Sequence, residues 1–92
     1  MLDKYTQAVL KIIKEQESLI GPLALDLAKK SENIVFSNGA QVTINGNPII
    51  ALGDLVGQYN TLFGRTSVEV SKLAIKKSGE SFTQEELPEI LK

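Results

Sequence analysis

The chain has 92 residues, of which 42% are hydrophobic and 23% charged, and its formal net charge is −1. This length fits a single domain, and the composition is that of a globular protein rather than a disordered chain. There is no Cys and no His, which excludes disulfides, zinc–thiolate sites and Ser-His-Asp triads within one chain. The balanced charge gives no bulk attraction to nucleic acid or to anionic lipid.

The first residues lack the basic start and apolar core of a signal peptide, and no apolar run is long enough to span a membrane. The start at Met1 suggests a complete small protein. We therefore expect a cytoplasmic protein that makes no contact with a membrane.

Residues 2–31 are predicted to be helical, because apolar residues recur at spacings of three and four. Gly21-Pro22 interrupts this run, and proline disfavours a helix interior because it lacks an N–H and crowds the preceding turn. Either the helix ends near Ile20 and Pro22 opens a second one, or one helix kinks there. The apolar stripe keeps its phase across the break, which favours a kink or a very tight corner. The stripe consists of Leu2, Tyr5, Val9, Ile12, Ile13, Ile20, Leu23 and Leu27.

Residues 33–46 are predicted to form a β-hairpin. The segments 34–36 and 42–44 are rich in strand-forming residues, and Asn38-Gly39 between them is typical of a two-residue type I′ turn. A second Asn-Gly, at 45–46, ends the second strand. Asn47 is then expected to cap a helix that has Pro48 at its first position.

Residues 48–78 again show helical periodicity, with a near-heptad seam that starts at Leu52 and runs to Leu73. Gly64 could end one helix, and Thr66 with Glu69 forms a capping-box pattern that could begin another. The unbroken seam favours one continuous helix. Such a helix would be about 46 Å long, whereas a compact body of this chain length is only about 32 Å across.

Residues 83–91 are predicted to form a short helix, with a capping box between Thr83 and Glu86 and a hydrophobic staple between Phe82 and Leu87. Pro88 is expected to bend this helix. No internal repeat is visible. The predicted fold class is therefore α+β and predominantly helical, with two long helical segments flanking a central hairpin.

The segment from Asn33 to Gly64 has 32 residues and a single charged side chain, Asp54. At the chain average we would expect about seven charges there. The segment could supply the core of the monomer, or it could also form an interface, since interface cores are depleted in charge. The overhanging helix favours a homodimer with a four-helix arrangement. The candidate interface residues, which could equally be monomer core, are Val35, Phe36, Val42, Ile44, Leu52, Val56, Tyr59 and Phe63.

Gly53, Gly57 and Gly64 would lie on one face of a continuous helix, together with Asn60. Small residues on one face allow another backbone to pack closely. Alternatively, Gly53 and Gly64 mark helix ends, or the glycines line a ligand notch. We expect the close-packing face or the helix ends.

We find no catalytic motif, no metal site and no cofactor site in the sequence, and no motif identifies a family. The acidic pairs, Glu15 with Glu17 and Glu85 with Glu86, do not face one another on a helix and are expected to be solvated. We therefore predict a non-enzymatic module that self-associates and binds another protein. One alternative is a DNA-binding protein of winged-helix or ribbon type, but the hairpin has no Lys or Arg to meet phosphates. The other is a small-ligand sensor.

Overall fold

The computed structural model describes residues 3–37 and 41–92. Over these residues the protein is mostly helical with one two-stranded antiparallel sheet, as the sequence predicts. The predicted turn at Asn38-Gly39 lies outside the described residues. The elements in chain order are α1 (Lys4–Ile20), α2 (Leu23–Ala28), β1 (Ile34–Phe36), β2 (Val42–Ile44), α3 (Pro48–Phe63), α4 (Arg65–Lys77) and two 3-10 turns, η1 (Gln84–Glu86) and η2 (Glu89–Leu91).

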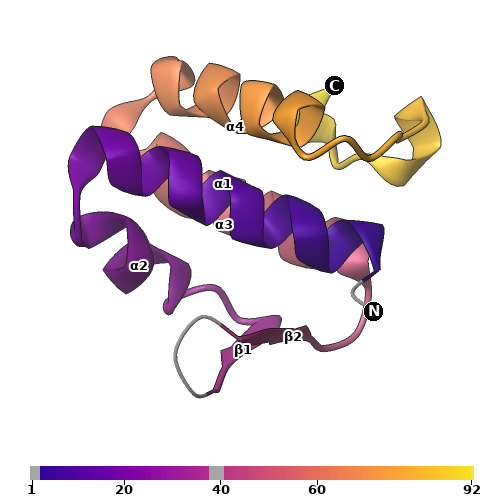
Figure 1. Ribbon diagram of the computed structural model, residues 1–92, viewed down its shortest axis with the longest axis horizontal. Helices are drawn as coiled ribbons and strands as arrows, with labels where there is room; N and C mark the ends of the chain where they lie inside the picture. The colour runs from indigo at the N-terminus through magenta and orange to yellow at the C-terminus, as the bar shows by residue number, and fades with distance from the viewer. Residues whose placement is uncertain (1–2, 38–40) are drawn as a thin grey trace.

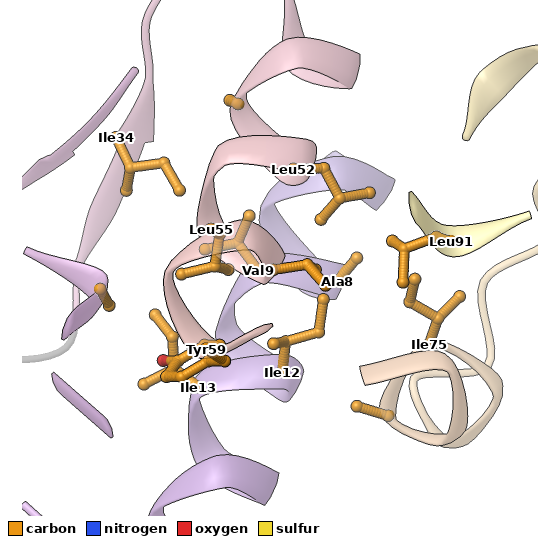
Figure 2. Close-up of a cluster of buried hydrophobic side chains, with 14 of the residues drawn as sticks. Ala8, Val9, Ile12, Ile13, Ile34, Leu52, Leu55, Tyr59, Ile75 and Leu91 are labelled. Atoms are coloured by element: carbon orange, nitrogen blue, oxygen red, sulfur yellow. The ribbon is translucent and has the colours of Figure 1, made fainter. Parts of the chain in front are cut away.

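The helices α1 and α3 form the centre of the molecule and run in the same direction (Figure 1). On one side they are covered by α4 and the C-terminal segment, and on the other by α2 and the hairpin. Figure 2 shows this arrangement in the core, where the side chains of α1 and α3 lie between Ile34 of the hairpin and Leu91 of the C-terminal segment. The hydrophobic core therefore draws on every helix and on both strands.

The helix α1 begins at an N-cap formed by Asp3, whose carboxylate accepts a hydrogen bond from the backbone N–H of Thr6 at 2.8 Å. It ends at Gly21, which has φ 69° and ψ −150°. The chain then turns directly into α2. The structure therefore has the first predicted alternative, in which the helix ends at Ile20 and a second helix follows Pro22, rather than the favoured kink. The turn between the helices is tight because Gly21 adopts a backbone conformation that other residues strongly disfavour.

The prediction of one continuous helix over 48–78 is wrong. Gly64 ends α3 with φ 71° and ψ −158°, and α4 begins at the next residue. The N-cap of α4 is Gly64, with no side-chain hydrogen bond to the first N–H groups, so the capping box predicted at Thr66 and Glu69 does not begin this helix. The hydroxyl of Ser67 donates to the carbonyl of Gly64 at 2.7 Å. The extents are 30 × 29 × 22 Å, and no helix overhangs the body. The length of the helices therefore no longer supports a homodimer.

The hairpin pairs Ile34 with Ile44 and Phe36 with Val42. It is fastened to α3 by the side-chain amide of Asn33, which donates to the carboxylate of Asp54 at 2.9 Å. The single charged residue of the central segment is thus a structural anchor. The predicted start of α3 is confirmed: the Asn47 side chain accepts hydrogen bonds from two backbone N–H groups, with Pro48 at the first position.

The C-terminal segment contains the predicted capping box between Thr83 and Glu86. Instead of one bent helix over 83–91, however, the segment forms two 3-10 turns, because Pro88 and Leu87 are both extended between them. The segment packs on the start of α1, where the hydroxyl of Tyr5 donates to the carbonyl of Glu86 at 2.8 Å.

Contrary to the sequence analysis, the chain contains an internal repeat. The α1–α2 unit and the α3–α4 unit correspond at a shift of 43 residues, the separation between Gly21 and Gly64. Both glycines have nearly the same backbone angles. The same positions are buried in the first helix of each unit, as Ala8, Val9, Ile12, Ile13 and Gln16 in α1 and as Ala51, Leu52, Leu55, Val56 and Tyr59 in α3.

Two buried hydrogen bonds relate the units reciprocally. The Gln16 side-chain amide donates to the carbonyl of Ser67 at 3.0 Å, and the Tyr59 hydroxyl donates to the carbonyl of Ala24 at 2.8 Å. Gln16 corresponds to Tyr59 in the repeat, and Ala24 corresponds to Ser67. In a two-fold interface each contact made by one unit is repeated by the other unit, and these two hydrogen bonds have that pattern. The units therefore pack about a local two-fold axis that runs between α1 and α3.

Candidate functional site

The predicted interface residues of α3 lie in the core of the chain itself. Leu52, Val56 and Tyr59 are fully buried. Burial raises the pKa of Tyr59 far above its ordinary value, with a smaller contribution from Glu17, and its hydroxyl is a buried donor. These three residues take the core role that the pattern also allowed, and they present no surface to a partner.

The predicted interface residues of the hairpin divide between two faces. Val42 is buried, while Phe36 and Ile44 are half-buried against the core. Val35 points away from the core and is 45% exposed. Phe63, the remaining predicted residue, is exposed at the end of α3.

The three glycines do not form a common close-packing face. A Cβ added to Gly53 would lie 3.1 Å from the Cβ of Pro88, so this glycine lets the C-terminal segment approach α3 closely. Gly57 faces open space. Gly64 marks a helix end, as one of the alternatives anticipated.

An apolar groove lies between α1, α2 and the hairpin, with a volume of about 590 Å³. Phe36 and Val42 form its hairpin wall. Two features make it a candidate binding site: its lining is mostly apolar, and it is partly open to solvent. The remaining lining residues come from α1 and α2 and are Leu10, Ile13, Lys14, Glu17 and Leu25.

Two of the residues that line the groove are charged. Lys14 and Glu17 follow one another at i, i+3 on α1 and carry opposite charges at its edge. No group of three or more acidic side chains that could hold a metal ion occurs within residues 3–37 and 41–92. The groove can therefore accept apolar groups and orient them with one cation and one anion.

A second apolar surface lies at the end of the molecule where both units turn (Figure 1). Leu19 and Leu23 flank the corner at Gly21, and Leu62 and Phe63 precede the corner at Gly64. Their exposed fractions are 62%, 40%, 59% and 41% respectively. We call these four residues the corner surface. Of them, the sequence analysis named Phe63 as an interface residue.

Of the residues that line the groove, Phe36 and Val42 of the hairpin were predicted as site residues from the sequence, whereas Leu10 and Leu25 of the helices were not. Leu10 lies on the flank of the apolar stripe, whereas Leu25 is two residues from both Leu23 and Leu27 and would lie on the opposite face of a continuous helix. Their half-buried state depends on where the hairpin returns to α1, which no local pattern specifies. An apolar residue on the flank of an otherwise polar helix face is the one sequence feature that could have indicated them.

Comparison of the chain with protein-family models, with curated proteins and with solved structures finds no match. Among the described residues, none of the helices combines the length and the apolar character needed to cross a membrane.

Proposed function

We propose that the protein is a non-enzymatic protein-interaction module whose groove between α1, α2 and the hairpin receives apolar side chains of a partner protein. The observation that carries this proposal is the groove itself, which is apolar, accessible and built from three separate elements. Interfaces concentrate their binding energy in a few apolar and aromatic side chains held in such pockets. Phe36 is the aromatic side chain of the groove.

The shape of the groove favours a chain segment over a small molecule. Small-molecule pockets enclose most of their ligand, whereas this groove is partly open to solvent. A partner segment can lay two or three side chains into it and leave its backbone outside. Lys14 and Glu17 would then set the direction of the segment by pairing with charges on it, since charges at an interface edge govern orientation.

The test is selection of peptides from a displayed random library on the wild-type protein. The enriched peptides are expected to bind the Leu10→Glu variant at least about tenfold more weakly, a difference of about 1.4 kcal/mol, because a carboxylate would enter the apolar groove. Leu73→Glu is the matched control, since Leu73 is 52% exposed on α4 and does not line the groove.

Circular dichroism checks that each variant is folded, and Phe36→Ala provides a second groove variant that adds no charge. The proposal fails if no peptide is enriched on the wild-type protein. It also fails if the selected peptides bind both groove variants as tightly as the control.

A second candidate, an apolar small-ligand sensor, is favoured by the groove volume of about 590 Å³, which is within the usual range for ligand pockets of about 300–1,000 Å³. A ligand present at 100 times its dissociation constant would stabilise the protein by about 2.7 kcal/mol. A thermal-shift screen with apolar metabolites tests this candidate, and a shift abolished by Leu10→Glu would support it over the peptide-binding role.

A further inference from the structure

The apolar stripes of α1 and α3 continue past the region where other elements cover them. Leu19 follows Ile12 by seven residues and Gln16 by three, so it lies on the same helix face as these buried residues. Leu62 stands in the same relation to Leu55 and Tyr59. Yet Leu19 is 62% exposed and Leu62 is 59% exposed. The core face of both helices is therefore uncovered in the last helical turn.

These two leucines are equivalent positions of the internal repeat, and they lie where the local two-fold axis leaves the molecule. The axis runs between α1 and α3, and both helices end at the same side of the body (Figure 1). The residues beside the leucines are also apolar in both units, Ile20 in the first and Phe63 in the second. The end of the molecule is thus an apolar surface with two similar halves.

We propose that the corner surface is the interface for a second copy of this chain, packed end to end. No charged residue occurs in the segments 18–25 and 60–64 that form it, so two copies can meet without burying a charge. The flanking residues have opposite signs, because Glu17 precedes the first segment and Arg65 follows the second. Copies related by two-fold symmetry place the same patch on both sides, so the anion of one copy can approach the cation of the other.

The area of the corner surface predicts a weak dimer. An aromatic side chain offers roughly 150–250 Å² and a leucine less, so the exposed fractions of the four residues sum to at most roughly 400 Å² for each copy. Two copies would bury at most roughly 800 Å² from these residues, which is at the low end of specific interfaces and typical of transient ones. We therefore expect dimers at high protein concentration and monomers under dilute conditions.

The experiment is sedimentation equilibrium over protein concentrations from about 50 μM to about 1 mM, a range that brackets weak association. The mass of the wild-type protein is expected to rise from the monomer value of 10.0 kDa toward twice that value. Leu62→Glu should raise the dimer dissociation constant at least about tenfold, because it places a carboxylate in the apolar interface. Leu19→Glu should have the same effect from the other unit.

Ile50→Glu is the matched control, since Ile50 is 55% exposed on the same helix as Leu62 but at its opposite end. It should leave the association unchanged. A wild-type mass of 10.0 kDa at the highest concentration overturns the proposal, and so does equal weakening by Ile50→Glu and Leu62→Glu. This inference goes beyond the proposed function, and its variants touch no residue of the groove, so either can fail while the other holds.

Discussion

The α1–α2 unit and the α3–α4 unit share a corner geometry and a pattern of buried positions, but they differ in what packs beside them. In the first unit the position equivalent to Gly53 is Leu10, and in the second the C-terminal segment comes within 3.1 Å of where a Cβ would lie on Gly53. Beside the first unit lies the hairpin, which leaves the groove uncovered against Leu10.

This difference shows how one repeated arrangement can carry two roles. A glycine on a helix face lets a neighbouring backbone approach closely, so the second unit is closed by the chain's own C-terminal segment. The equivalent position of the first unit is Leu10, which lines the apolar groove together with Phe36 and Val42 of the hairpin. We interpret the first unit as the one that presents the groove, whereas the corner surface draws on both units.

The largest expected effect comes from the reciprocal pair of hydrogen bonds. Tyr59→Ala should lower the free energy of unfolding by about 3–5 kcal/mol, because it empties the centre of the core. Gln16→Ala should cost less, about 1–3 kcal/mol, because it removes a smaller side chain together with its buried hydrogen bonds to Ser67 and Ser71. Urea denaturation measures both.

The control for this pair is Tyr59→Phe, which keeps the ring and removes the donor to the carbonyl of Ala24. It should cost about 1–3 kcal/mol. If Gln16→Ala changed the free energy of unfolding as little as a surface substitution does, the two hydrogen bonds would differ in energy. The two units would then be equivalent in geometry but not in stability.

An intermediate effect is expected at the two corners. Gly21 and Gly64 have positive φ with ψ near −155°, a region that is almost exclusive to glycine. Alanine at either position should therefore lower the free energy of unfolding by about 1–3 kcal/mol, and by a similar amount in both units.

Gly57→Ala is the matched control for the corner variants, since Gly57 is inside a helix and faces open space. There alanine should stabilise the protein by up to about 1 kcal/mol through its better helix propensity. Thermal unfolding separates these outcomes, because 1 kcal/mol changes Tm by about 4–8 °C in a domain of this size. If the two alanine variants lowered the free energy of unfolding by different amounts, the surroundings of Gly21 and Gly64 would constrain the same backbone angles to different extents.

Local chemistry predicted the junctions that depend on residues close in sequence better than those that depend on distant contacts. The caps at Asn47 and Thr83 and the corner at Gly21 follow from side-chain chemistry within a few residues. The break at Gly64 was recognised as an alternative but not favoured, because a heptad seam continues through it and periodicity does not record whether a helix turns back on itself. The break depends on the tertiary contact of α4 with α1, which lies far away in sequence.

The candidate site was predictable in part for the same reason. Phe36 and Val42 were identified from the uncharged hairpin, whereas Leu10 belongs to the groove because of the path the hairpin takes. The repeat was missed because few residues are identical between the units. The correspondence lies in burial and in backbone angles, and these become visible when the chain is folded.

The smallest expected effect concerns the ion pairs that join α1 to the side of the second unit. A hydrogen bond from Lys4 lowers the pKa of Glu86, with help from the backbone N–H of Thr83, and a hydrogen bond from Lys77 lowers the pKa of Glu15. A carboxylate whose pKa is lower in the folded state stabilises the protein above its unfolded pKa, and this contribution is lost as the pH falls through the folded pKa.

Acidification from about pH 6 to about pH 3 should therefore lower Tm, since unfolded Glu titrates near about 4.3. Glu86→Gln and Glu15→Gln should each make Tm less dependent on pH over this window, and by a small amount because both ion pairs are solvent-accessible. Glu85→Gln is the control, as it removes a neighbouring carboxylate that forms no ion pair within the described residues. If all three variants reduced the pH dependence of Tm equally, net charge rather than these two ion pairs would govern acid stability. Attachment of α1 to the second unit would then make no specific contribution to it.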